Sequence, residues 1–284
     1  MTSPKPTTRG IALIAVLWLV AAMSLIATGI VQSVRGEIRS VGAQRHALIA
    51  VARADAAILL ALQNLQAQPQ GNSSASQTLG VEFEGDQYSV LVESLNGRID
   101  INSAPIALLS ALYTHIGGLD AQGAQALAQA TVDTRELKSS KGARRNFDAI
   151  EDLLGVPQMT YDLYAKLTGL ITADIIGGSG RVNPKAAPPG VLLVIAGGNA
   201  ARAGDFAAQR DVNPNLMDTS FFDPAYIDAA TSPSLRLQVT IGLADGASAL
   251  RVWHVYWGAD PHSGLPWRVL SRPKPVIRLL QPAG

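Results

Sequence analysis

The chain has 284 residues, a formal net charge of +1 and no cysteine. A net charge this small excludes an overall electrostatic attraction to nucleic acid or to an acidic substrate. The absence of cysteine excludes disulfides, thiolate metal sites and a cysteine nucleophile. A chain of this length can bury a sizeable core and is long enough for more than one domain.

The chain begins with a short polar leader that holds Lys5 and Arg9 and ends at Gly10. No charged residue follows from position 11 to position 34. As a helix, this run would be about 36 Å long, which is enough to cross a hydrocarbon layer of about 30 Å with some tilt. The N-terminal segment is therefore predicted to enter a membrane.

Three interpretations of this segment are open. A secretory signal peptide would have a shorter apolar region and a small-residue cleavage site, for which Ala21 and Ala22 or residues 27–29 could serve. A signal anchor would keep the whole segment. A prepilin-type leader would be cut after Gly10, so that the apolar run becomes the new N-terminus.

Helical composition continues past the apolar run, which favours the third interpretation. Apolar residues recur at a spacing close to 3.6 through residues 34–62, with charged residues between them. No proline occurs between Pro6 and Pro69. We expect one helix over residues 11–66, about 84 Å long, with its first half in lipid and an apolar stripe of its second half against a soluble domain.

This long bipartite helix resembles the stem of the type IV pilin family. The processing site of that family is similar to the local sequence Arg9, Gly10, Ile11, Ala12, Leu13 and Ile14. The family generally has a glutamate at the fifth mature position, where this chain has Ala15. In the family, that carboxylate pairs with the N-terminal amine of a neighbouring subunit, because an unpaired carboxylate in an apolar bundle is costly. Its absence is typical of the protein K family of minor pseudopilins, although an ordinary membrane helix would also carry alanine.

The segment after the stem begins as a loop and then alternates. Residues 66–79 are rich in Gln, Ser and Asn and are expected to form the loop. Alternation at residues 81–84 and 88–93 predicts a hairpin of two strands, with Gly85 and Asp86 between them, and residues 99–102 predict a short strand.

Helices and then strands are expected in the rest of the chain. Ser103 and Pro105 favour a helix start, and helices are predicted at residues 106–113, 120–132, 147–154, 161–167, 191–196 and 200–210. Residues 168–176 have strand-like composition, and residues 177–180 are expected to be a flexible joint. The motif around Asn102 returns around Asn183. Further strands are predicted at residues 235–241, 249–257, 267–270 and 275–280, with Asp245 and Gly246 turning between the first two.

Two stretches, residues 102–135 and 147–156, resemble helix-hairpin-helix modules. Paired copies hold DNA phosphates through backbone N–H groups at glycine-bracketed hairpins, for example in membrane-anchored DNA-uptake receptors. This chain departs from that pattern, because Asp120 follows the first hairpin and residues 156–160 contain no glycine pair. A basic cluster stands nearby, at Lys138, Lys141, Arg144 and Arg145, and would also suit a solvated loop. A helical protein-interaction domain is favoured, with DNA binding as the alternative.

The stem and the two helical blocks make nearly the whole chain similar to the protein K family. That family has a leader, a stem and a pilin-like α+β body with a large all-α domain inserted into it. The resemblance therefore implies an α+β fold with a leader at 1–10, a transmembrane and stem helix at 11–66, a pilin-like body at 67–101 and 177–284, and an inserted helical domain at 102–176.

The resemblance also implies a role and partners. The chain would cap the tip of a periplasmic pseudopilus and help start its assembly, so that folded proteins are exported across the outer membrane. Its partners would be other minor pseudopilins, the major pseudopilin and the prepilin peptidase, with a single-pass anchor in the bacterial inner membrane and no nucleic acid. Gly10 and Ile11 would be the processing residues, and Leu13, Ile14 and Ala15 would serve stem assembly. A minor pilin of a type IV pilus is a further alternative.

Signatures of common enzymes are missing from the sequence. It carries no Gly-x-Ser-x-Gly elbow, no His-Glu-x-x-His helix and no phosphate-binding loop. The four histidines are scattered: His46, His115, His254 and His262. Five acids could offer oxygen ligands to a hard cation, although their spacing matches no standard calcium loop: Asp205, Asp211, Asp218, Asp223 and Asp228. We expect no enzyme activity and no cofactor, with calcium left open by the resemblance.

Overall fold

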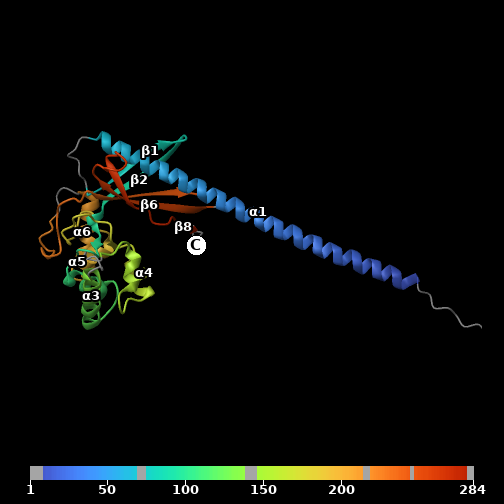
Figure 1. The fold of residues 1–284 in the computed structure, drawn as a ribbon, viewed down its shortest axis with the longest axis horizontal. Coiled ribbons are helices and arrows are strands. Elements are labelled where there is room, and N and C mark those ends of the chain that lie inside the picture. The colour runs from blue at the N-terminus through green and yellow to red at the C-terminus, as the bar shows by residue number, and fades with distance from the viewer. Residues whose placement is uncertain (1–8, 69–74, 138–145, 214–217, 244–245, 280–284) are drawn as a thin grey trace, which may run out of the picture.

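The computed structural model describes residues 9–68, 75–137, 146–213, 218–243 and 246–279. Its largest element is the helix α1 (Arg9–Ala67), whose 59 residues make it about 88 Å long. Figure 1 shows the N-terminal half of α1 projecting away from the rest of the chain. The predicted helix at residues 11–66 is confirmed, because neither proline nor a change of periodicity interrupts it.

The second half of α1 lies on an antiparallel sheet. The strands are β1 (Ser76–Phe83), β2 (Asp86–Ser94), β5 (Ser234–Gly242), β6 (Ala247–Trp257), β7 (Trp267–Ser271) and β8 (Val276–Leu279). Their order is β1-β2-β5-β6-β7, and β8 also pairs with β6. The turn between β1 and β2 is Glu84 and Gly85, both with positive φ, one residue earlier than predicted. The turn predicted at Asp245 falls partly outside the described residues.

One edge of the sheet is interrupted. The strands β7 and β8 pair with opposite ends of β6, at residues 254–257 and 247–250. Residues 272–275 lie between them and include Pro273 and Pro275, which have no backbone N–H to donate. A broken edge of this kind is a poor template for pairing with another chain.

Small residues bring α1 close to the sheet. The stem side of this core is fully or nearly fully buried and consists of Ala50, Ala54, Ala57, Ile58, Ala61 and Leu62. The sheet contributes alternate residues of its central strands, such as Leu237, Val239 and Val255, because successive side chains of a strand point to opposite faces. We call this the stem core.

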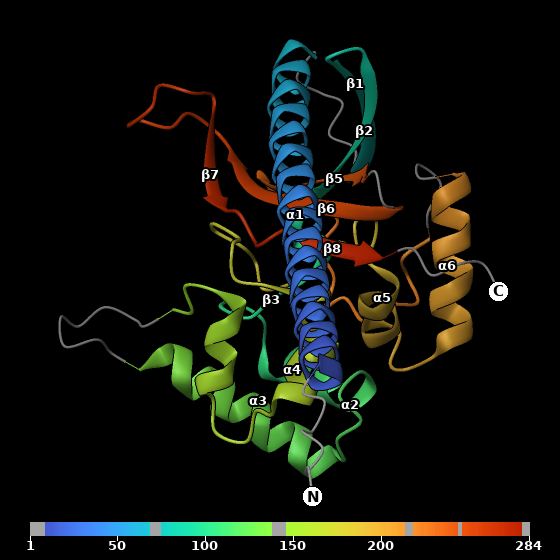
Figure 2. The ribbon, with the colours of Figure 1, turned by 90° about the vertical axis from the view of Figure 1, so that its right-hand side faces the viewer.

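The chain leaves the sheet after β2 and returns to it at β5. Ser94 at the end of β2 is the register partner of Leu235 at the start of β5. Between them lie η1 (Leu95–Gly97), β3 (Ile99–Asp100), α2 (Ile106–His115), α3 (Ala121–Glu136), η2 (Ile150–Gly155), α4 (Tyr161–Leu167), β4 (Ile171–Thr172), α5 (Pro189–Ile195) and α6 (Ala200–Val212). Apolar residues between Ile99 and Phe222, most of them in these elements, form a second core, which we call the helical core. It lies on the side of the sheet opposite α1 (Figures 1 and 2).

Several predicted elements differ from this outcome. The helix expected at residues 147–154 is a 3₁₀ helix that begins at Ile150, because Phe147 instead exchanges two backbone hydrogen bonds with the side chain of Asn102. The strand expected at residues 168–176 is confined to β4. The boundary predicted between the inserted helical domain and the second part of the body, at residues 176 and 177, stays a prediction. The helices α5 and α6 lie after that boundary and pack in the helical core together with α2.

Two units of the helical core repeat one set of contacts around Asn102 and Asn183. In each unit two short segments pair in parallel, Ile99 with Ile171 and Val182 with Ile227. Each asparagine donates its side-chain amide to two backbone carbonyls, those of Phe147 and Ala173 for Asn102 and those of Ala229 and Ala230 for Asn183. The motif that repeats in the sequence around Asn102 and Asn183 therefore makes a repeated set of contacts.

A helical hairpin follows each asparagine, α2–α3 in the first unit and α5–α6 in the second. The second helix of each hairpin starts at a side-chain cap, with Asp120 accepting from Gly123 N at 2.7 Å and Asn199 accepting from Arg202 N at 3.1 Å. Near its end an arginine reaches back to the start of the first helix. Arg135 donates to the carbonyls of Ile101 and Ala104 at 3.0 and 2.9 Å, and Arg210 donates to that of Ala187 at 2.6 Å.

Two of the glycines expected to be a flexible joint, Gly178 and Gly180, are packed against the first unit. A Cβ on Gly180, whose φ is +73°, would meet the backbone oxygen of Ser103 at 2.2 Å. A Cβ on Gly178 would meet a side-chain carbon of Ile175 at 2.8 Å. These positions need glycine for close approach of the backbone.

Candidate functional site: the stem and its attachment

The first part of the stem exposes apolar side chains on every face. The described residues from Leu13 to Ile26 are all exposed, and Leu13 is 71% and Ile14 60% accessible. Ala15 lies exposed beside them. Apolar side chains around a whole helix need an apolar surrounding, either lipid or other helices. Gly10 and Ile11 belong to the first turn of α1, and leader residues 1–8 lie outside the described residues.

Two stretches of α1 are apolar enough to consider as membrane segments. Ser40–Ala67 is long and apolar enough to cross a membrane, by length and composition, and Leu13–Ile26 is a shorter apolar stretch. The first stretch packs on the sheet, so the stem core uses its apolar face. The second stretch has no cover from the described part of the chain. A long apolar helix near the N-terminus is compatible with a single-pass membrane anchor.

An apolar stripe also continues along the outer face of the stem. Val41, Leu48 and Leu59 are 59%, 71% and 41% exposed. Helical spacing places them on the side opposite the buried residues Ala54 and Ala61. The stem can therefore pack against the sheet and against another apolar surface at the same time.

One carboxylate attaches the stem to the sheet. Asp55 accepts hydrogen bonds from Arg251 Nε at 2.6 Å and from Trp253 Nε1 at 2.8 Å, and Arg251 Nη2 lies 3.4 Å from its other oxygen. Arg251 also donates to the carbonyl of Pro273 at 2.8 Å, and the guanidinium of Arg272 lies 3.9 Å from the ring centre of Trp253. Stem, central strand and interrupted edge are thus joined at one point.

A second, exposed ion pair lies nearby. Arg53 on α1 approaches Glu84 at 3.0 Å and Asp86 at 3.7 Å, at the turn of the first hairpin. All three side chains are between about two-fifths and three-fifths exposed. Because solvent screens such pairs, we expect this one to contribute little to stability.

Sequence reasoning missed the Asp55 attachment, since its partners are 196 and 198 residues away. One signal was present in the sequence. Asp55 is an acid between alanines in the apolar half of the stem, where a carboxylate needs a partner.

The turn of the first helical hairpin has one acid and one cation among its described contacts. Asp120 caps α3, and Lys166 donates to the carbonyl of Gly117 at 3.4 Å. The hairpin that repeats the first is α5–α6, whose junction holds Gly197 and Gly198 at positive φ, whereas the sequence had paired the first with residues 147–156. The basic cluster at residues 138–145 lies outside the described residues.

The acids considered as calcium ligands serve local turns where their contacts are known. Asp218, Asp223 and Asp228 each accept a hydrogen bond from the backbone N–H two residues later. Within the described residues, no three histidine or acidic side chains are grouped to hold a metal ion. His115 packs against Gly198, His254 contacts Asp174, and His262 lies 91% exposed beside Asp260.

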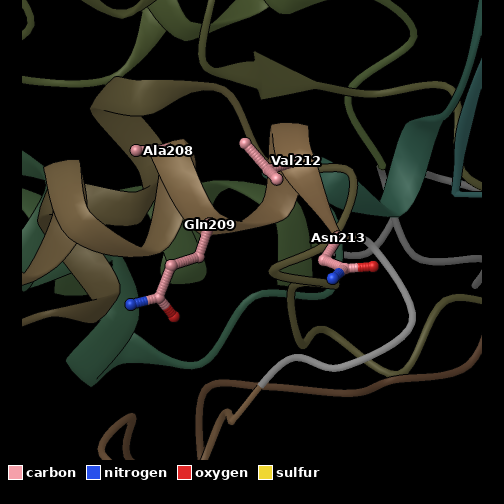
Figure 3. Close-up of a pocket in the computed structure, with 4 residues that line it drawn as sticks. All are labelled: Ala208, Gln209, Val212 and Asn213. Carbon is pink, nitrogen blue, oxygen red and sulfur yellow. The ribbon is translucent and has the colours of Figure 1, made fainter.

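A shallow hollow lies at the C-terminal end of α6 (Figure 3). It is lined by Ala208, Gln209, Val212 and Asn213. None of these four side chains titrates, so the hollow offers hydrogen bonds but no acid–base chemistry.

Comparison with known proteins bears on the fold. No protein-family model matches this chain, and no curated protein matches it. A chain in the crystal structure of the GspK–GspI–GspJ complex, from the type 2 secretion system of enterotoxigenic Escherichia coli, is similar to it with a TM-score of 0.52 and 17% sequence identity. The match covers 84% of this chain and 98% of that one. The chain has a pseudopilin-like α+β fold, with a long apolar N-terminal helix on a sheet body.

Proposed function

We propose that this chain is a minor pseudopilin of a type II protein secretion system, similar to protein K. The supporting observation is that the two parts of α1 have different surroundings. Its first part exposes apolar side chains on every face, and its second part packs on a sheet in a pseudopilin-like fold. A helix built in this way suits a subunit that waits in a membrane and then joins a bundle of stems.

Two features support a place at the tip of the pseudopilus. Ala15 stands where the resembled family has a glutamate that pairs with a neighbouring N-terminal amine, and a tip subunit would have no such amine to meet. The helical core adds bulk on the far side of the sheet from the stem (Figure 1). A wide head is tolerated where no subunit stacks above it. There the chain would cap the pseudopilus and help start its assembly for export of folded proteins across the outer membrane.

The proposed partners follow from the same role. Other minor pseudopilins would pack on the stem. In support, the similar solved chain belongs to a complex of GspK, GspI and GspJ. The outer stripe of Val41, Leu48 and Leu59 is a surface for them. The major pseudopilin would follow below, and the prepilin peptidase would cut the leader. The chain would be a single-pass protein of the bacterial inner membrane with its globular part in the periplasm.

The role requires neither catalysis nor a cofactor. The chain would act by packing and by position, and we propose that it is not an enzyme. A bound calcium ion would be structural, if one is present near the acids of residues 205–228.

The experiment is mass spectrometry of the N-terminus of the full chain, made in cells with and without the prepilin peptidase. The proposal expects a start at Ile11 that depends on the peptidase. Gly10→Val should block the cut. Gly42→Val is the matched control, because a Cβ on this stem glycine meets nothing within 4 Å and the cut at Gly10 should persist.

A different N-terminus of the mature protein would change the proposal. An intact Met1, or a cut at residues 22–29, would overturn the pseudopilin proposal and make DNA binding by the helical hairpins the next hypothesis to test. A start at Ile11 leaves the choice between a type II system and a type IV pilus, which co-purification with the other minor pseudopilins would decide.

A further inference from the structure

The face of the sheet opposite the stem carries a row of polar side chains. Glu93 on β2 is the register partner of Arg236 on β5, which in turn pairs with His254 on β6, and His254 pairs with Ser271 on β7. Residues paired in register share a face of a sheet. The neighbouring residues Leu237 and Trp253 belong to the stem core, so the row lies on the face toward the helical core.

The charges of this row are balanced by the helical side of the chain. Arg98, just after η1, approaches Glu93 at 3.4 Å, and Arg236 approaches the same carboxylate at 3.0 Å. Both arginines are at least four-fifths buried, and burial and the charge of Arg98 lower the pKa of Arg236 to about 10. Two buried cations, one on each side of the boundary between helical core and sheet, thus share the Glu93 carboxylate.

Asp174 crosses from the helical core to the far strands of the sheet. It follows β4, and its Oδ2 accepts from His254 Nδ1 at 2.6 Å and from Ser271 Oγ at 2.8 Å. Ser271 Oγ and His254 Nδ1 are themselves 3.1 Å apart. His254 on β6 and Ser271 on β7 thus converge on one carboxylate oxygen of Asp174. This is not the arrangement of a catalytic triad, in which the serine and the acid contact different nitrogens of the histidine.

The position of this contact matters because the chain itself connects the helical core to the sheet at a different place. The helical core is joined covalently to the sheet at the adjacent ends of β2 and β5, where Ser94 and Leu235 are paired. Ser271 lies two strands beyond β5, roughly 10 Å away at the usual spacing of strands. The Asp174 contact therefore lies to one side of the covalent join and two strands away from it, whereas the Arg98–Glu93 pair lies beside that join.

We propose that Asp174, His254 and Ser271 form a latch that holds the helical core to the far strands β6 and β7 of the sheet only while the Asp174 carboxyl is ionised. An ionised carboxylate accepts both hydrogen bonds, from His254 Nδ1 and Ser271 Oγ. A neutral carboxyl gives up a lone pair to its own proton and becomes a weaker acceptor for these two donors. Interfaces held by polar contacts allow relative movement of their two sides once the contacts are lost.

The direction of the pH dependence follows from Asp174. Burial by itself raises the pKa of this carboxyl, but the hydrogen bonds from His254 and Ser271 outweigh burial, so the pKa lies below its ordinary value of 3.8. A depressed pKa means that the latch contributes stability above the unfolded pKa and loses it as the pH falls through the folded one. Asp100 on β3 is the acid coupled to this carboxyl: burial and, to a smaller extent, the charge of Asp174 raise the pKa of Asp100.

The test measures the distance between the two cores in the full chain in detergent. The chain has no cysteine, so Thr78→Cys on β1 and Gln125→Cys on α3, both exposed, can carry two spin labels. Pulsed electron resonance at pH 7 should give a narrow distance distribution. Asp174→Asn and Ser271→Ala should each broaden it, and far-UV circular dichroism should confirm that the helices persist.

The chain supplies a matched control. Asp260 also accepts from Ser263 Oγ, at 2.7 Å, and has a histidine neighbour, His262, but this trio lies within one loop. Asp260→Asn should leave the distribution narrow. Narrow distributions in Asp174→Asn and Ser271→Ala, with helices intact, would overturn the proposal. So would equal broadening by Asp260→Asn. If Asp174→Asn fails to fold, Ser271→Ala alone decides, because it removes one neutral donor.

Discussion

Asp55→Ala should lower the free energy of unfolding by about 3 kcal/mol, because it removes the acceptor that joins the stem to the sheet. The Arg251 side chain is 9% exposed and would keep the Pro273 carbonyl as an acceptor, and Trp253 would lose the acceptor of its indole N–H. Breaking a buried ion pair typically costs about 3–5 kcal/mol, and a hydrogen bond to a charged group contributes about 1.5–3 kcal/mol. Since Asp55 is 30% exposed, the lower part of that range applies.

Urea unfolding of the full chain in detergent, followed by near-ultraviolet circular dichroism, measures this difference. The matched control is Arg53→Ala, which breaks the exposed pair on the same helix and should cost less than about 1 kcal/mol. A double-mutant cycle with Arg251→Met should give a coupling energy of about 1–3 kcal/mol between the two side chains. If Asp55→Ala and Arg53→Ala are equally mild, or if the cycle gives no coupling, the stem is not attached through this carboxylate.

Two further predictions concern the helical core. Gly180→Ala should lower the free energy of unfolding by about 3 kcal/mol, because its Cβ would meet the Ser103 backbone oxygen at 2.2 Å. The control Gly177→Ala has a similar positive φ but lies in open space and should cost about 1 kcal/mol. Equal costs would mean that the backbone conformation alone matters. Arg210→Met should lower the free energy of unfolding by about 1.5–3 kcal/mol, because it removes the 2.6 Å hydrogen bond to the Ala187 carbonyl. The control Arg202→Met, at an exposed position of the same helix, should cost under about 0.5 kcal/mol. Similar midpoints of thermal unfolding for the two variants would mean that Arg210 does not stabilise the hairpin.

Much of the secondary structure could be predicted from the sequence. The stem was clear because its periodicity and lack of proline are local signals, and α3 was clear because Asp120 marks its start. The strands β5 and β6 were clear because apolar and polar residues alternate in them. The segment at residues 147–154 looked helical by its own composition, but Asn102 bonds to Phe147 and delays the helix start to Ile150.

The long apolar stem, most helices and strands, and the repeat around Asn102 and Asn183 could be predicted from the chain, because each depends on residues close together in it. The pairs of side chains that meet across the fold could not be predicted in this way. Asp55 meets Arg251 across 196 residues and Asp174 meets His254 across 80. Such pairs depend on strand register, where a shift of one residue reverses the face of every side chain, and no local pattern records that register.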